Sequence, residues 1–333
     1  MGKFEKLFNQ FLDCVQTLQK ALNVSFTEAL VETFDNLEQG KIKVENGAPD
    51  EQTVAELSKK YQSLDYDEIS QKDKAQVFTF LTLKAINDDG FDVNKMPTPP
   101  AISTVIAMLM HKLVKNEKVE IVDPTIGTGI LLFSIISQLK ALNHSKDNYQ
   151  LVGIDNDEEM LNLADVAAHL NDFDIELYCQ DALMPWMCSN PDVVVSDLPI
   201  GYYPVDENAK KFENRAEKGH SFAHLLLIEQ IIKNLKPAGY AFLVVPKSIL
   251  SGKIGADFMP WLTKKLYLKA IVELPDDMFK NKFNQKSILV FQNHGEDAKA
   301  SEVLLTKLDS LKKEEALIRF NVKLNEWYTK INH

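Results

Sequence analysis

The feature that most constrains the fold of this chain is an apolar segment that runs directly into a glycine-rich turn. Residues 119–122 read Val-Glu-Ile-Val, residues 123–129 read Asp-Pro-Thr-Ile-Gly-Thr-Gly, and an apolar stretch follows at residues 130–139. The two glycines let the backbone approach a bound molecule closely, because they carry no Cβ. The segment therefore predicts a strand, a tight turn and a helix, with a ligand at the carboxyl end of the strand.

The charge beside this turn indicates which kind of ligand it binds. A dinucleotide-binding loop has the pattern G-x-G-x-x-G and places a pyrophosphate at the N-terminus of the helix. This loop has only Gly127-Thr128-Gly129, and the carboxylate of Asp123 precedes it. A carboxylate repels a phosphate and attracts an ammonium group. The cofactor that fits this sign is S-adenosylmethionine, which carries an amine and no phosphate.

Two further predicted strands also end in acidic residues. Residues 149–154 lead into Asp155-Asn156, and residues 175–179 lead into Gln180-Asp181-Ala182. A carboxylate after the second strand can accept hydrogen bonds from both hydroxyls of a ribose, and the segment after the third can meet the adenine amino group. The alternative is that these acids are ordinary helix caps. Three acidic strand ends behind one glycine turn favour the cofactor.

The fourth predicted strand ends in the motif that indicates the chemistry. Residues 191–196 lead into residues 197–203, Asp-Leu-Pro-Ile-Gly-Tyr-Tyr. Here the chain resembles the adenine-specific, amino-methylating DNA methyltransferases, whose signature is Asn/Asp/Ser-Pro-Pro-aromatic. The resemblance runs from about residue 97 to residue 293 and includes Thr98-Pro99-Pro100, the loop at residues 123–129, and residues 244–246 and 274–279. It is strongest to small bacterial proteins that look like the methylase core of restriction systems without a DNA-recognition domain.

The resemblance implies a cofactor site and a catalytic site. S-adenosylmethionine would be converted to S-adenosylhomocysteine at residues that match the family's cofactor motifs: Thr98, Asp123, Thr125, Gly127, Thr128, Gly129, Asp155, Asn156, Asp181, Ala182 and Asp197. In the family, the first side chain of the tetrapeptide and the next backbone carbonyl accept the two hydrogens of the adenine amine. The catalytic residues implied are Asp197, Leu198 and Pro199.

The chemistry explains why two acceptors are needed, and the chain departs from the signature in two places. The lone pair of the adenine amine is delocalised into the ring, so the nitrogen must be held in line with the methyl group. Leu198 replaces the first proline, and Ile200 replaces the aromatic residue that stacks on a flipped base. Such stacking contributes about 1–3 kcal/mol per base. We expect Ile200 near the substrate, together with four aromatic residues: Tyr202, Tyr203, Phe279 and Phe283.

The net charge of −11 restricts how the chain can bind nucleic acid. Binding to DNA depends on neutralising phosphates, so an acidic protein must gather its basic residues locally. One candidate cluster is Lys210, Lys211, Arg215 and Lys218, and a second is Lys264, Lys265, Lys269, Lys280, Lys282 and Lys286. Both are mixed with acids, and about forty residues follow Asn293, too few for a recognition domain. We therefore expect a nucleic acid partner, DNA more than RNA, with a protein partner supplying recognition.

The chain divides into two predicted parts. Residues 1–95 look all-helical, with helix starts at Ser25, Asp50 and Ser70 and a helix end at Gly40. Residues 96–333 alternate strands and helices, which predicts an α/β methyltransferase domain with a doubly wound, seven-stranded, mostly parallel Rossmann-like sheet. The loop at residues 201–219 exceeds an ordinary connector and predicts either a mobile binding loop or a disordered insertion.

Composition limits the location and the metal chemistry of the protein. The three cysteines have no metal-binding spacing and are odd in number, so we expect no metal site and reduced thiols in a cytoplasm. No apolar run approaches ~18 residues, so no membrane span is expected. Two alternatives to nucleic acid methylation stay open. The protein could bind S-adenosylmethionine without catalysis and act through a partner, or it could methylate a protein amide nitrogen.

Overall fold

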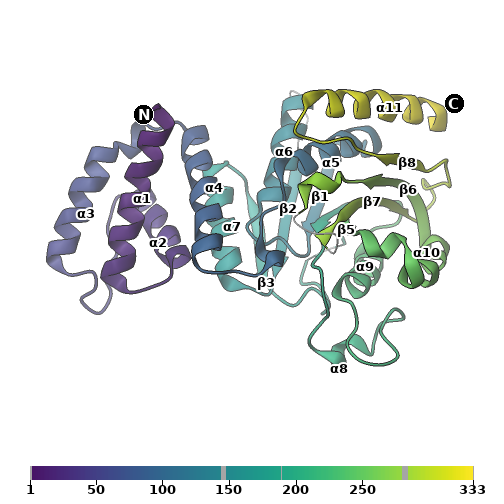
Figure 1. Ribbon diagram of the computed structural model, residues 1–333, viewed down its shortest axis with the longest axis horizontal. Coiled ribbons are helices and arrows are strands. Elements are labelled where there is room, and N and C mark those ends of the chain that lie inside the picture. The colour runs from purple at the N-terminus through teal and green to yellow at the C-terminus, as the bar shows by residue number, and fades with distance from the viewer. Residues whose placement is uncertain (1, 144–147, 189, 280–283, 333) are drawn as a thin grey trace. The chain divides into compact units, whose positions relative to one another are not determined.

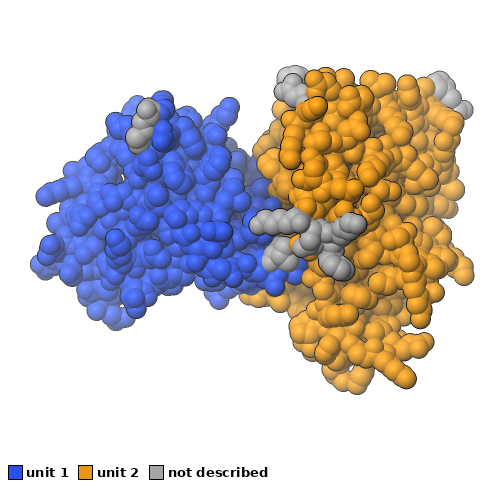
Figure 2. Space-filling view, viewed as in Figure 1, with its two compact units in different colours: residues 1–97, 127–133, 157–175 blue, residues 98–126, 134–156, 176–333 orange. Residues whose placement is uncertain are grey.

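A computed structural model describes residues 2–143, 148–188, 190–279 and 284–332 (Figure 1). The chain forms two compact units (Figure 2). Unit 1 contains residues 1–97, 127–133 and 157–175, and unit 2 contains residues 98–126, 134–156 and 176–333. Each unit thus combines segments that are separated in sequence. The domain boundary near residue 96, between a helical domain and a methyltransferase domain, stays a prediction.

Unit 1 is built from helices. Three of them begin at the N-cap residues that the sequence predicted, and one ends at the predicted glycine. The side chains of Ser25, Asp50 and Ser70 accept hydrogen bonds from the backbone N–H three residues on, and Gly40 ends its helix in the left-handed conformation. The helices are α1 (Lys3–Leu22), α2 (Phe26–Gln39), α3 (Glu51–Leu64), α4 (Gln71–Asp88) and α7 (Glu158–Leu170), with short 3-10 turns η1 (Tyr66–Glu68) and η2 (Val93–Lys95).

An aromatic cluster forms the core of unit 1. The ring of Phe34 stacks on Phe11 with centroids 5.1 Å apart and meets Phe78 edge-on at 4.9 Å. Such ring pairs stabilise a core beyond the area that they bury. Helix α7 completes this core with Met160 and Leu163, which are fully or almost fully buried in the same cluster. The helix that follows the second strand therefore packs with the N-terminal helices, which sequence periodicity did not indicate.

Unit 2 contains an eight-stranded sheet in the order β3-β2-β1-β4-β5-β7-β6-β8 (Figure 1). Strands β1, β2, β4 and β5 pair in parallel, β7 runs antiparallel to both β5 and β6, and β8 pairs in parallel with β6. The doubly wound, mostly parallel fold is confirmed, and β8 adds one strand to the seven expected. The strands are β1 (Lys118–Asp123), β2 (Asn148–Asp155), β3 (Ile175–Cys179), β4 (Val193–Asp197), β5 (Tyr240–Pro246), β6 (Leu266–Glu273), β7 (Lys286–Asn293) and β8 (Leu304–Lys307).

Helices pack on this sheet and on one another. Helix α9 contacts β5, α10 contacts β6, and α11 contacts α5. The remaining helical elements are α5 (Pro100–Leu113), α6 (Ile130–Asn143), which has residues in both units, α8 (Asp206–Ala209), α9 (Ala223–Asn234), α10 (Gly252–Lys265), α11 (Glu314–Asn332), η3 (Lys247–Leu250) and η4 (Asp276–Met278). Within the described ranges, no helix is long and apolar enough to span a membrane.

The strand order reverses between β1 and β4, which is where a binding site is expected. The chain proceeds from β1 outward through β2 to β3, and then returns to place β4 on the other side of β1. Ligands of open α/β sheets bind outside the carboxyl ends of the strands at such a reversal. Asp123 ends β1 and Asp197 ends β4, so both side chains lie at this point.

Gly153 in β2 makes room for the turn after β1, and this close packing can be tested. A Cβ at Gly153 would lie 2.4 Å from Cδ1 of Ile126 and 2.8 Å from Cδ2 of Leu177. We expect Gly153→Ala to lower the free energy of unfolding by about 1–3 kcal/mol through overpacking, measured by urea denaturation. Adding Ile126→Val removes the nearest methyl group and should restore part of the loss. A double variant that is no more stable than Gly153→Ala alone would contradict this explanation.

Candidate active site

The centre of the site is a hydrogen-bonded cluster between the ends of β1 and β4. The hydroxyl of Ser196 donates to the Asp123 carboxylate at 2.8 Å, and the backbone N–H of Thr125 donates to the same oxygen at 3.0 Å. The Thr125 hydroxyl lies 2.6 Å from the Ser196 hydroxyl and 3.3 Å from the Asp197 carbonyl oxygen. These contacts fix the turn after β1 to the end of β4.

Asp123 is buried, and burial alters its ionisation. Only 1% of the residue is exposed. Desolvation raises the pKa of its carboxyl group to about 7, although the hydrogen bonds from Ser196 and Thr125 oppose this shift. The negative charges of Asp155 and Asp197 also contribute to this raised pKa. A positively charged ligand near these carboxylates would favour the ionised form of Asp123.

Both carboxylate oxygens of Asp197 have partners, and one partner was not expected from the sequence. The Thr98 hydroxyl donates to Oδ2 at 2.8 Å, and the ammonium group of Lys286 donates to Oδ1 at 2.5 Å. The same ammonium lies 3.4 Å from the Leu198 carbonyl oxygen. The side chains of Lys286 and Asp197 are 16% and 19% exposed. Lys286 was predicted only as part of a basic surface, because its place at the start of β7 gives no sequence signal of this contact.

The two other acidic strand ends occupy different surroundings. Asp155 ends β2, and its carbonyl oxygen accepts the backbone N–H of Gln180 at 2.8 Å. The carboxylate of Asp181 accepts the backbone N–H of Leu183 at 2.9 Å and the hydroxyl of Tyr203 at 2.5 Å. The cap of α7 is Asp157, not Asp155. Helix capping therefore does not account for Asp155, and direct contacts of Asp155, Asn156, Asp181 and Ala182 with a cofactor stay predictions.

The glycine turn has the backbone conformation that its sequence requires. Gly127 and Gly129 have φ angles of +53° and +74°, which side chains of L-residues rarely adopt. A Cβ on Gly129 would lie 2.2 Å from a ring carbon of Phe133. These angles and the lack of space for a Cβ at Gly129 explain why glycine stands at these positions, and the close approach of this backbone to a ligand stays a prediction.

The expected substrate side contains one exposed ring and one buried ring. Tyr202 is 61% exposed and stacks on Phe222, with centroids 4.8 Å apart and an interplanar angle of 20°. Tyr203 is 7% exposed, and its contact with Asp181 raises the pKa of its hydroxyl, after the larger effect of desolvation, to about 12. Tyr203 therefore holds Asp181, and only Tyr202 of this pair offers a ring face. Ile200 and Phe279 are half-buried, and Phe283 lies outside the described residues.

Phe222 and His224 were missed because the start of α9 was misplaced. The sequence predicts a helix at residues 220–235, but α9 spans Ala223–Asn234. A backbone bridge between Tyr202 and Phe222 holds residue 222 in an extended conformation instead. His224 follows in the first turn of α9 and is only 2% exposed. Its burial beside Phe222, with ring centroids 5.4 Å apart, was not readable from the local sequence.

The long loop after β4 is anchored by the buried carboxylate of Glu229. It accepts the backbone N–H groups of Glu213 and Asn214 at 2.8–3.1 Å and the Asn214 side chain at 3.1 Å, and it pairs with Lys233 at 2.8 Å. The loop also contains α8 and buries Phe212. The loop at residues 201–219 is therefore a folded segment rather than an unstructured insertion.

This anchor predicts a measurable effect on stability. Glu229→Gln should lower the free energy of unfolding by about 2 kcal/mol, because hydrogen bonds to a buried charge are stronger than neutral ones. Glu207→Gln is a matched control, since Glu207 and Lys210 form a pair with side chains 77% and 67% exposed. Its loss should cost less than about 1 kcal/mol. Thermal denaturation of both variants checks the difference, and equal losses would contradict the anchoring role.

The basic residues proposed for nucleic acid are only partly available. Lys265 pairs with Glu213 at 2.9 Å, and Lys210 pairs with Glu207 at 2.5 Å. Lys269 is 4% exposed and donates to the Lys299 carbonyl oxygen, so its place on a basic surface was wrong. Lys280 and Lys282 lie outside the described residues.

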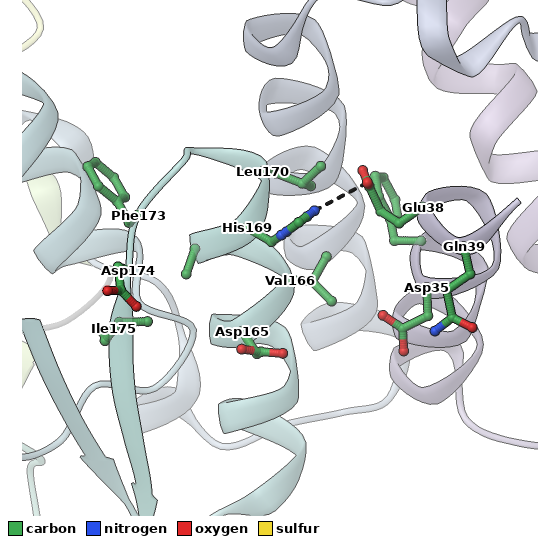
Figure 3. A pocket seen from close by; sticks show the side chains of 12 residues that line it. Asp35, Glu38, Gln39, Asp165, Val166, His169, Leu170, Phe173, Asp174 and Ile175 are labelled. Atoms are coloured by element: carbon green, nitrogen blue, oxygen red, sulfur yellow. Dashed lines mark hydrogen bonds and ion pairs between the residues drawn. The ribbon is translucent and has the colours of Figure 1, made fainter.

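Unit 1 contains a separate acidic pocket (Figure 3). Its cavity of about 310 Å³ lies between α2, α7 and the start of β3. Asp35, Glu38 and Asp165 line it, and His169 lies 3.2 Å from a Glu38 carboxylate oxygen (Figure 3). Desolvation and the charge of Asp165 raise the pKa of Asp35. In the described ranges, no group of three or more His, Cys, Asp or Glu side chains is arranged to hold a metal ion.

Comparisons with known proteins assign the chain to a family. The N-6 DNA methylase family matches residues 75–327, and the YtxK N-terminal helical domain matches residues 5–86. The uncharacterized protein YtxK of Bacillus subtilis is 32% identical over 320 residues, which cover 94% of each chain. A Listeria monocytogenes protein assigned to the class I S-adenosylmethionine-dependent methyltransferases is 33% identical, with a TM-score of 0.86 and 98% of each chain covered.

More distant structures share the fold. The modification subunit of a type I restriction enzyme assigned in Vibrio vulnificus has a TM-score of 0.66 at 18% identity, covering 84% of this chain and 62% of that one. A type I methyltransferase subunit from Streptococcus thermophilus has a TM-score of 0.63 at 15% identity, covering 97% and 79%. The carboxyl-edge site, the sheet order and the family match together show that the chain belongs to the N-6 DNA methylase family of class I S-adenosylmethionine-dependent methyltransferases.

Proposed function

We propose that the protein transfers a methyl group from S-adenosylmethionine to the exocyclic amine of adenine in DNA or RNA. The observation that carries this proposal is the position of the Lys286 ammonium group, which lies 2.5 Å from Asp197 Oδ1 and 3.4 Å from the Leu198 carbonyl oxygen. A single nitrogen is thus held by two acceptors. An amine nitrogen at the same place would have both hydrogens bound, and this is the arrangement that methyl transfer to an amine needs.

The side chains at the sheet edge fit S-adenosylmethionine. Asp123 is a buried carboxylate that a cationic ligand would stabilise in its charged form. Asp155 ends the neighbouring strand, where a ribose is expected. Asp181 is held in place by Tyr203. When bound, the cofactor supplies a methyl group made electrophilic by its sulfonium.

The protein's own groups would bind and orient the acceptor. The Asp197 carboxylate and the Leu198 carbonyl would accept the two amine hydrogens and align the nitrogen lone pair. Their partial negative charges would stabilise the positive charge that develops on the nitrogen. The Thr98 hydroxyl would hold Asp197 in this orientation through its hydrogen bond of 2.8 Å. The Leu198 backbone carbonyl keeps this role although the usual proline is absent.

The exposed ring of Tyr202 is the candidate platform for the base. It stacks on Phe222 and lies a few residues after Asp197, where it would replace the aromatic residue lost at Ile200. We expect Tyr202→Ala to raise the KM for nucleic acid by about 10–100-fold, since stacking contributes about 1–3 kcal/mol per base. Tyr202→Phe should behave like the wild type in steady-state assays. A normal KM in the alanine variant would remove Tyr202 from the site.

Recognition of a nucleic acid is proposed to involve a second protein. Structural relatives include a modification subunit of a restriction enzyme, and this chain carries a net charge of −11 with several basic groups paired to acids. An acidic surface binds phosphates poorly. A partner that contributes positive charge would supply the contacts that base flipping requires.

Transfer of labelled methyl groups tests the proposal. The full chain is incubated with S-adenosylmethionine labelled in its methyl group and with DNA or RNA, alone and with proteins captured from the source cell. Label in N6-methyladenine supports the proposal. Tight cofactor binding without label in either nucleic acid would reject it.

One observation favours a second candidate, a protein that binds the cofactor without catalysis. Lys286 fills the space between the two acceptors, and the signature has lost its first proline and its aromatic residue. Such a protein would act by binding a partner. This candidate would be supported if the protein bound a partner only in the presence of the cofactor, kept this binding in the Asp197→Ala variant, and transferred no methyl group.

A further inference from the structure

An amine of the protein itself lies where the proposed function requires an acceptor amine. The Lys286 ammonium group donates to Asp197 Oδ1 at 2.5 Å and lies 3.4 Å from the Leu198 carbonyl oxygen. These are the two groups that would hold the hydrogens of a nitrogen to be methylated. The Lys286 side chain is only 16% exposed, and the Thr98 hydroxyl holds the other carboxylate oxygen of Asp197 at 2.8 Å. The lysine nitrogen therefore occupies a defined position in the site.

The same nitrogen lies at the end of the sheet where the methyl donor is expected. Asp197 ends β4, and its carbonyl oxygen lies 3.3 Å from the Thr125 hydroxyl in the turn after β1. Lys286 begins β7, which pairs with β5, and β5 pairs with β4. This register brings the Lys286 nitrogen to the carboxyl ends of β1 and β4, which is the side of an open α/β sheet on which ligands bind.

We propose that Lys286 is itself a methyl acceptor of this site, so that the protein methylates its own lysine at Nζ when S-adenosylmethionine is bound. The inference rests on the proposed function for the methyl donor and for the two hydrogen-bond acceptors. It adds an acceptor of a different chemical class, an alkyl amine that belongs to the chain.

The transfer requires one proton to leave the nitrogen first, because an ammonium group has no lone pair. Asp197 and Leu198 can hold two of its three hydrogens, and the third leaves to water as a proton. The Nζ lone pair then forms a bond to the methyl carbon of the donor. The carbon–sulfur bond breaks, and its electron pair stays on sulfur. The products are a methylammonium group on Lys286, S-adenosylhomocysteine and one released proton.

The arrangement also sets how many methyl groups the lysine receives. Methylation keeps the positive charge of a lysine, and the singly methylated nitrogen has two hydrogens left. Asp197 and Leu198 can accept both of them, so a second transfer would have to break one of these hydrogen bonds. The expected product is therefore Lys286 with a single methyl group.

Mass spectrometry of the full chain tests the proposal. The wild-type protein is incubated with S-adenosylmethionine labelled in its methyl group, without nucleic acid, and the peptides that contain Lys286 and Lys236 are compared. Lys236 is a matched control, since its ammonium group pairs with Asp192 at 3.1 Å, just before the start of β4. We expect one labelled methyl group on Lys286 and none on Lys236. No label on Lys286, or equal label on both lysines, would overturn the proposal.

The rate of self-methylation provides a second test. With saturating cofactor, the rate should rise about tenfold per pH unit between about pH 6 and 8, because only the unprotonated alkyl amine has a lone pair. The rate per chain should not change on dilution, since the lysine and the site belong to one molecule. Asp197→Ala should lower it by about 10²-fold through loss of alignment. A rate that falls in proportion to protein concentration would overturn the proposal.

The outcomes separate this proposal from the proposed function. Label on Lys286 without label in nucleic acid supports the proposal and rejects nucleic acid as the acceptor. Label in nucleic acid without label on Lys286 does the reverse, and calorimetry that detects no cofactor binding rejects both. A readout that needs no activity assay is the mass of the Lys286 peptide in protein purified from the source cell, where we expect the methyl group to be present already.

Discussion

Replacing Asp197 with alanine is expected to lower kcat for methyl transfer by about 10²–10³-fold, the usual loss when one preorganised polar contact to the developing charge is removed. The substitution deletes the acceptor that binds Thr98 at Oδ2 and Lys286 at Oδ1. The remaining acceptor, the Leu198 carbonyl, cannot orient both amine hydrogens alone. The incoming nitrogen would then lose its alignment with the methyl group.

The Asp197 prediction has an internal control. Asp197→Asn keeps a carbonyl oxygen of similar shape and removes the negative charge, so its kcat should lie between those of the wild type and the alanine variant. Single-turnover transfer and calorimetric cofactor binding are measured for all three proteins. The kinetic role is refuted if alanine leaves single-turnover rates within about twofold of the wild type.

The affinity for S-adenosylmethionine is expected to fall by about tenfold per pH unit below pH 7. The cause is Asp123, whose pKa is raised to about 7 by burial. Below that pH the free protein binds a proton at Asp123, and a cationic ligand must displace this proton before it can pair with the carboxylate. Calorimetry in buffers of different ionisation enthalpy would measure proton release on binding near pH 6.

The raised pKa of Asp123 also determines how the free energy of unfolding changes with pH. The folded pKa of about 7 lies above the ordinary value of 3.8, so the contribution of this group is fully present below about pH 4 and is lost as pH rises through 7. Asp123→Asn should remove both this decline and the pH dependence of cofactor binding. A cofactor affinity that does not vary between about pH 5.5 and 8 would show that Asp123 does not face the ammonium.

Much of the fold could be predicted because local patterns and physical requirements agree. The apolar runs that predict the first four strands lie within two residues of β1 to β4, and Ser25, Asp50 and Ser70 cap their helices as expected. The start of α9 could not be predicted. It depends on a bridge between Tyr202 and Phe222, residues that are distant in sequence.

The sequence by itself determined the family and predicted the cofactor class and the position of the acceptor motif, because acidic strand ends, a glycine turn and a short signature are local features whose chemistry is set by residue type and order. Only the tertiary structure decided that Lys286 contacts Asp197 and Leu198, and that His224 is buried beside Phe222. Lys286 is 89 residues from Asp197, and the antiparallel pairing of β7 with β5 brings it to the end of β4. Such contacts arise from strand order and register, and no local pattern in the sequence encodes them.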